Sequence, residues 1–155
     1  MADIVDRSTR SRMMASIKGR NTAPERFVQQ ALAAQHLSFE AHSRLLPGTP
    51  DLVLPLYQVA LFVNGCFWHR HEGCFYATTP ATQKDFWKNK LGENVLRDAR
   101  KRAEIEALGW RVITVWECGV KHCPEQFGEV VDAIEGELVI SEWPQSPPRV
   151  RSGES

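Results

Sequence analysis

The sequence has no apolar run approaching the roughly 20 residues that a membrane-spanning helix requires, which argues against a membrane protein. Its first residues, MADIVDRSTR, lack the apolar segment of a signal peptide, so we expect a cytoplasmic protein. Cysteine is scarce, with four residues in 155. In a reducing compartment, clustered Cys and His residues indicate a metal site and not a disulfide framework.

The chain also lacks an excess of either charge, because 19 Lys and Arg residues balance 19 Asp and Glu residues. The charges are nevertheless unevenly distributed. Lys and Arg outnumber acids by five to two in residues 1–20 and by seven to three in residues 84–102, whereas residues 117–155 hold three against eight. Basic segments can neutralise the phosphates of a nucleic acid, but the same pattern is common in solvated helix faces.

Hydrophobic periodicity and turn residues predict one α/β domain. We expect helices over 8–19, 21–37 and 82–108 and from Pro124 to about residue 135, and strands over 38–42, 51–54, 58–63 and 111–118. Together they predict a mixed β-sheet flanked by helices. Residues 141–155, which are rich in Pro, Ser and Gly, are predicted to be a disordered tail.

The predicted helix over 82–108 carries apolar residues at helical spacing and ends before Gly109. They are Phe86, Trp87, Leu91, Val95 and Ala99. Their spacing places them on one face of the predicted helix.

The segment NGCFWHRHEGC places Cys66, His71 and Cys74 within nine residues. Such spacing is typical of a structural Zn²⁺ site, in which four protein ligands leave no position for water. Cys118, at the end of the last predicted strand, is our expected fourth ligand, and Cys123 is the alternative. Reduced thiols packed in a core would not explain the clustering of the first three.

Within the same segment, His69 stays available if His71 binds the metal. An imidazole that titrates near neutral pH can accept a proton from water. A surface histidine or a second zinc ligand would fit the same spacing.

Five motifs in this order resemble those of the very short patch repair mismatch endonucleases, which have a restriction-endonuclease-like fold. They are RSRMMASIKGRNTAPE, LPGTPDLVLP, VNGCFWHRHEGC, FWKNKLGENVLRD and LGWRVITVWEC. The resemblance implies a Mg²⁺-dependent nick on the 5′ side of the T in a T:G mismatch, formed where 5-methylcytosine is deaminated.

The resemblance also implies roles for individual residues. Asp51 and the backbone carbonyl of Val63 would bind the catalytic Mg²⁺, and His69 would be the general base. Asp98 would orient His69, and Glu25 would lie near the metal. Without the resemblance, Asp51 reads better as a turn residue after Pro50, and Asp98 as an exposed helix carboxylate that pairs with Arg102.

Aromatic residues acquire a function from the same resemblance, because opening a base step requires apolar side chains that wedge between bases. Phe67, Trp68 and Trp87 resemble the wedge of the family, and Met14 and Ile17 of the basic helix over 1–20 would insert from the other groove. Packing within the protein is the alternative for each.

The resemblance implies further expectations for the whole chain. Residues 21–140 would form the endonuclease domain, which we expect to be a monomer acting on double-stranded DNA. A mismatch-repair coordinating protein would be a partner, and a cytosine-5 DNA methyltransferase would be functionally linked. Two alternatives stay open: a restriction-type nuclease that cuts both strands of matched DNA, and a non-catalytic, zinc-stapled DNA-binding module.

Overall fold

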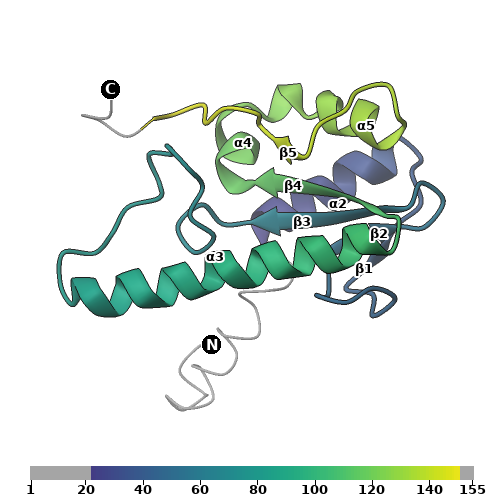
Figure 1. The fold of residues 1–155 in the computed structure, drawn as a ribbon. Coiled ribbons are helices and arrows are strands. Elements are labelled where there is room, and N and C mark those ends of the chain that lie inside the picture. The colour runs from purple at the N-terminus through teal and green to yellow at the C-terminus, as the bar shows by residue number, and fades with distance from the viewer. Residues whose placement is uncertain (1–21, 151–155) are drawn as a thin grey trace, which may run out of the picture.

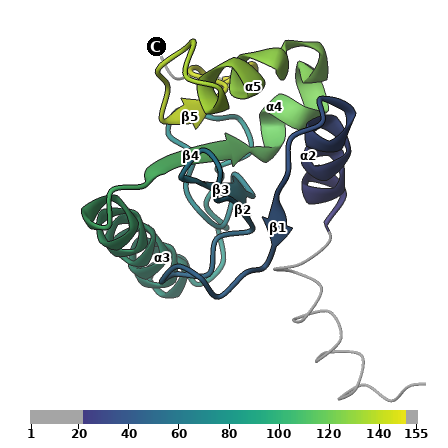
Figure 2. The ribbon, with the colours of Figure 1, turned by 90° about the vertical axis from the view of Figure 1, so that its right-hand side faces the viewer.

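The computed structural model describes residues 22–150 (Figures 1 and 2). The predicted helix over 8–19, with Met14 and Ile17, lies outside the described residues. In chain order the elements are α2 (Ala23–Ala34), β1 (Glu40–Ala41), β2 (Leu52–Leu54), β3 (Val59–Asn64), α3 (Lys84–Ala107), β4 (Arg111–Trp116), α4 (Glu117–His122), the 3-10 helix η2 (Pro124–Gln126), α5 (Gly128–Ile134) and β5 (Glu142–Trp143). The predicted strands and helices within this range are all present, and α4 and β5 are additional.

The strands form one mixed sheet in the order β1-β2-β3-β4-β5. The first three strands are antiparallel neighbours, as expected for runs separated by short turns. β3 and β4 are parallel, with Leu61 opposite Ile113, because α3 carries the chain back to the end of the sheet at which β3 begins. The functional loop 65–83 therefore begins where β3 ends.

Helices cover both faces of the sheet, with α3 on one face and α2, α4 and α5 on the other (Figures 1 and 2). Alternation along β3 explains the two cores, since successive side chains in a strand point to opposite faces. Val59 and Leu61 pack in the larger core with α2 and α5. Ala60 packs in the smaller core with Ile105 of α3. The predicted mixed sheet flanked by helices is confirmed.

The apolar face of the long helix α3 is mostly exposed. Of the expected apolar face only Leu91 is buried, whereas the side chains of Phe86 and Val95 are 56% and 42% exposed. The N-terminal end of α3 extends beyond the sheet beside the loop 65–83 (Figure 1), and Ile105, near the other end, packs in the core. Apolar residues in the first turns of α3 are thus left at the surface near the loop.

The tail prediction was wrong for the described part of residues 141–155. Glu142 and Trp143 form β5, which pairs with β4, and Trp143 is fully buried against Phe127. The indole N–H of Trp143 also donates a hydrogen bond to Glu129 at 3.1 Å. Burying this large aromatic side chain stabilises the fold by about 3 kcal/mol, which is enough to order a segment whose Pro-rich composition favours disorder.

No helix within residues 22–150 is long and apolar enough to span a membrane.

Candidate active site and metal cluster

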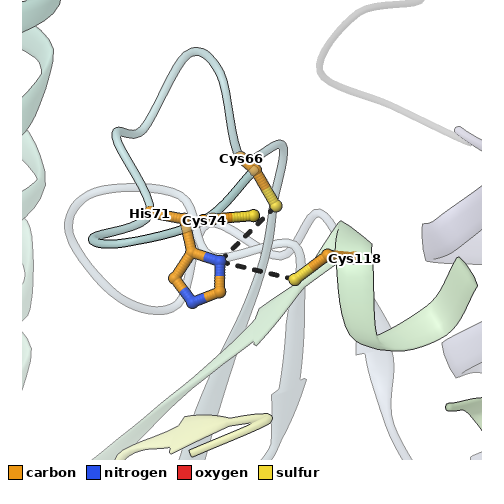
Figure 3. Close-up of side chains that lie close together, drawn as sticks. All are labelled: Cys66, His71, Cys74 and Cys118. Carbon is orange, nitrogen blue, oxygen red and sulfur yellow. Dashed lines mark hydrogen bonds between the residues drawn. The ribbon is translucent and has the colours of Figure 1, made fainter. Parts of the chain in front are cut away.

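The loop 65–83 and the start of α4 bring together the four residues predicted to bind zinc (Figure 3). The ligand atoms of Cys66, His71, Cys74 and Cys118 all lie within 4.8 Å of one another, and all four residues are buried. Cys118 joins the cluster because α4 begins directly after β4, beside the loop that follows β3. Cys123, the alternative ligand, packs in the main core instead.

The dimensions of the cluster fit a tetrahedral metal site. His71 Nδ1 lies 3.6 Å from Cys66 Sγ and 3.4 Å from Cys118 Sγ. Zinc bonds of about 2.3 Å to sulfur and about 2.0 Å to nitrogen would place such ligand atoms roughly 3.5 Å apart. The His71 ring stacks on Trp116 with centroids 4.2 Å apart, which fixes the orientation of the ring.

The chemistry of the sulfur atoms also fits a cation. The Cys118 thiol donates a hydrogen bond to Cys66, which lowers the pKa of Cys66 to about 4 and raises that of Cys118. Burial raises the pKa of Cys74. Several thiolates this close together would repel one another, so a dication is the species that would allow them all to ionise.

The loop places His69 beside α3, where its Nδ1–H donates a hydrogen bond to Asp98 Oδ2 at 2.6 Å. An ionised carboxylate can only accept, so this contact fixes the ring tautomer and leaves Nε2 as the nitrogen that can accept a proton. The surface pair considered for Asp98 is not formed, because Arg102 contacts Glu106 and the Thr114 hydroxyl. The structure therefore brings together the predicted base and its predicted orienting group.

A cleft of about 690 Å³ connects this pair with the predicted metal carboxylates. Glu25, Asp51, Val63, His69 and Asp98 all line it. The residues come from α2, the start of β2, the end of β3, the loop and α3. Only the tertiary fold could bring them to one cavity.

Asp51 lies just before β2, where its Oδ2 accepts a hydrogen bond from the Val63 N–H at 2.7 Å. Burial raises the pKa of Asp51 from 3.8 to about 6; the Val63 hydrogen bond opposes this rise, and the neighbouring Glu25 adds to it. Glu25 is fully buried in the first turn of α2, which Thr22 caps by accepting from the Glu25 N–H at 3.3 Å. Two carboxylates held in one partly dry cleft can bind a hard cation.

Sequence reasoning missed several residues of the cleft. Lys90, Arg97 and Lys101 line it from α3, and their spacing of seven and four residues places them on one helix face. That periodicity was a readable signal for a basic helix face. Glu117 also lines the cleft; burial raises its pKa, and it accepts a hydrogen bond from the Cys66 N–H. His42, which lies beside Glu25 and Asp51 but does not line the cleft, was missed as well, and nothing in its local sequence marks it.

The predicted aromatic wedge residues form one cluster. The ring centroids of Phe67, Trp68 and Trp87 are 5.1 to 5.9 Å apart in pairwise contacts, and each side chain is half-buried. Phe86 extends the cluster at 5.4 Å from Trp87 and is exposed. The Trp68 carbonyl accepts a hydrogen bond from Asn94 of α3 at 3.3 Å, which ties the loop to the helix. Phe67 and Trp68 also line the cleft.

Comparison with known proteins shows clear relatives. Residues 2–75 match the family described as DNA mismatch endonuclease Vsr. The chain is 44% identical over 121 residues to the DNA mismatch endonuclease Vsr of Escherichia coli (strain K12), covering 78% of this chain and 77% of that protein. It is 42% identical over 118 residues to the type II nicking enzyme V.XorIIP of Xanthomonas oryzae pv. oryzae, covering 76% and 86% of the two chains.

The fold has a relative among solved structures. The catalytic domain of the homing endonuclease I-Bth0305I superposes with a TM-score of 0.53 at 21% sequence identity, over 76% of this chain and 99% of that domain. At this identity the likeness concerns the fold, which is that of a nuclease catalytic domain.

The metal cluster predicts different outcomes for two buried cysteines. Cys66→Ser should lose bound zinc and unfold at a lower temperature, because one sulfur ligand is replaced by a poorer hydroxyl ligand. Cys123→Ser, the matched control, should keep its zinc, since Cys123 lies in the main core. Metal analysis and thermal melting measure both, and equal zinc content in the two variants would contradict the assignment.

The raised pKa of Asp51 predicts a gain in stability on neutralisation. As pH rises from 3.8 to about 6, Asp51 ionises in the unfolded chain before it ionises in the fold, so stability is lost over this range. At pH 8 in buffer without Mg²⁺, Asp51→Asn should therefore raise the free energy of unfolding by about 1–3 kcal/mol. Thermal melts from pH 4 to 8 test this, with the exposed Asp132→Asn as control; a lower melting temperature for Asp51→Asn at pH 8 would refute it.

Proposed function

The chain belongs to the Vsr family of DNA mismatch endonucleases, and from this premise we propose that it is a Mg²⁺-dependent enzyme that nicks DNA on the 5′ side of the T in a T:G mismatch. It is an endodeoxyribonuclease, which removes the non-catalytic DNA-binding module from the alternatives. The observation that carries the proposal is the convergence of the His69–Asp98 pair and Asp51 on one cleft. Hydrolysis of a phosphodiester needs an activated water and a site that absorbs negative charge, and these residues supply both.

His69 is the proposed general base. Its Nε2 takes a proton from water while the oxygen of that water attacks phosphorus and the bond to the 3′ oxygen of the preceding nucleotide breaks. Asp98 holds the ring through Nδ1 and stabilises the imidazolium that forms. The pair is partly exposed, with side-chain exposures of 32% and 29%, so that water can reach it.

Asp51, the carbonyl of Val63 and the nearby Glu25 are the proposed holders of the catalytic cation. Oxygen donors of this kind suit Mg²⁺, which when bound would neutralise charge that develops on the phosphate oxygens. The Val63 N–H that donates to Asp51 keeps the carboxylate in place at the end of the adjacent strand.

In this proposal, basic and aromatic side chains bind the DNA. Lys90, Arg97 and Lys101 lie along the wall of the cleft that α3 forms, where they can bind the phosphates that flank the scissile bond. The cluster of Phe67, Trp68 and Trp87 stands at the same cleft and would wedge into the mismatched step, which is cheaper to unstack than a matched one.

Zinc is the metal that we propose for the four-residue cluster, in a structural role. All four ligands come from the protein, so no coordination position remains for water or substrate. The ion would fix Cys66 and His71, and thereby the positions of residues 67 to 69 in the segment that joins these two ligands.

Several whole-chain expectations remain proposals. Residues 21–140 form the endonuclease domain, and Met14 and Ile17 of residues 1–20 contact DNA. The enzyme acts as a cytoplasmic monomer, cooperates with a mismatch-repair coordinating protein and is linked functionally to a cytosine-5 DNA methyltransferase.

Paired duplexes test the proposed substrate. The full chain with Mg²⁺ should nick the T strand of a duplex with one T:G pair, and it should leave the same duplex with C:G intact. Denaturing electrophoresis with each strand labelled separately reads the product. Cutting of both strands of the C:G duplex would instead favour the restriction-type alternative.

A second test addresses the base. His69→Ala should reduce the nicking rate by about 10²–10⁴, the usual contribution of a general base, while the Kd for T:G duplex changes by less than about threefold. Asp98→Asn should reduce the rate less. His36→Asn is the control, because His36 is exposed at the end of α2 and Asn tolerates its positive φ of 61°. Unchanged turnover in His69→Ala would remove His69 from the mechanism.

A further inference from the structure

His42 is a third potential ligand beside the two carboxylates of the cleft. The ligand atoms of Glu25, His42 and Asp51 all lie within 4.8 Å of one another. His42 Nε2 is 2.7 Å from Glu25 Oε2. Neither the general base nor the proposed catalytic cation site uses this histidine.

The fold places His42 there through strand register. β1 pairs with β2 so that Ala41 lies opposite Leu52, and the next residues continue the pairing, with the His42 N–H donating to the Asp51 carbonyl at 3.0 Å. His42 has a φ of +55°, a left-handed conformation that is uncommon for a residue with a side chain. Its imidazole reaches the first turn of α2, where it meets Glu25.

The tip of the imidazole has an incomplete environment. Nε2 is buried from solvent and makes no aligned hydrogen bond within the described residues, although Glu25 lies at ion-pair distance. Glu25 is itself fully buried, and its other described partner is the amide of Gln29 at 3.1 Å. A buried nitrogen without an aligned partner and two neighbouring carboxylates are both stabilised by a cation placed between them.

We propose that His42 Nε2, Glu25 and Asp51 form a mixed nitrogen–oxygen site for a divalent cation that binds Mn²⁺ more tightly than Mg²⁺. This inference rests on the proposed function, because Asp51 is also the proposed ligand of the catalytic cation. Mg²⁺ favours oxygen ligands and retains its waters, whereas an imidazole nitrogen suits first-row transition metals. His42 thereby determines which cation the free enzyme takes up before DNA arrives.

Mn²⁺ itself is the probe. Titration of the full-length, zinc-loaded protein without DNA, followed by the electron paramagnetic resonance signal of free Mn²⁺, should show one site that Mg²⁺ displaces only at much higher concentration. His42→Asn keeps a residue that tolerates positive φ but removes the ring nitrogen, and should weaken Mn²⁺ binding at least tenfold. His36→Asn is matched in both substitution and backbone conformation, and should bind Mn²⁺ like the unmodified chain.

Pulsed electron paramagnetic resonance of the Mn²⁺ complex adds an independent reading. A coupling to a histidine nitrogen should appear in the unmodified chain and disappear in His42→Asn. Equal Mn²⁺ affinity in the two proteins, or a spectrum without nitrogen coupling, would mean that His42 and Glu25 form only a structural ion pair.

The two proposals fail separately. If the unmodified chain shows no preference for Mn²⁺ over Mg²⁺ but nicks the T:G duplex in Mg²⁺, the role of His42 alone is overturned. If the unmodified chain prefers Mn²⁺ and His42→Asn removes that preference, but the unmodified chain does not nick the duplex, the proposed function alone is overturned. Zinc content and melting temperature of each variant show whether the fold is retained.

Discussion

The position of the proposed base depends on how the loop 65–83 is fixed. A loop of this length has few backbone hydrogen bonds of its own, yet it carries the proposed base and two of the three wedge residues. The cluster of Cys66, His71, Cys74 and Cys118 anchors it to the end of β4, and the stacking of His71 on Trp116 extends that anchor into the sheet. The Arg70 guanidinium adds hydrogen bonds to the carbonyls of residues 67, 77 and 78. A side chain held this firmly can serve as a base without reorganising during the reaction.

The cleft contains both buried carboxylates and basic side chains. Burial, and to a lesser extent the neighbouring Glu25, raise the pKa of Asp51, so its ionised form destabilises the free enzyme, and a bound cation would offset that cost. Lys90, Arg97 and Lys101 of α3 line the same cleft and give it positive charge that can attract phosphates. A protein with no net charge can therefore bind DNA, because the relevant quantity is the local distribution of charge and not its sum.

Local features were predictable from the sequence because they depend on neighbouring residues. Thr22 and Pro24 mark the start of α2, apolar runs mark β2 to β4, and the spacing of Cys66, His71 and Cys74 indicates a metal site. Family resemblance supplied the roles of His69 and Asp98, and the 2.6 Å contact between them is consistent with those roles. The exposure of the apolar face of α3 could not be predicted, because periodicity reports amphipathicity but not how far a helix extends beyond its sheet.

The sequence by itself determined where the chain turns, which segments are helical or extended, and which family it belongs to, since backbone preference and motif spacing act over a few residues. Only the tertiary structure decided that Cys118 and not Cys123 joins the cluster, that Trp143 is buried, and that His42 meets Glu25 and Asp51. These pairings join residues far apart in the chain. They are set by strand register and helix packing, which minimise the free energy of the whole domain, so the sequence around any one of these residues leaves alternatives open.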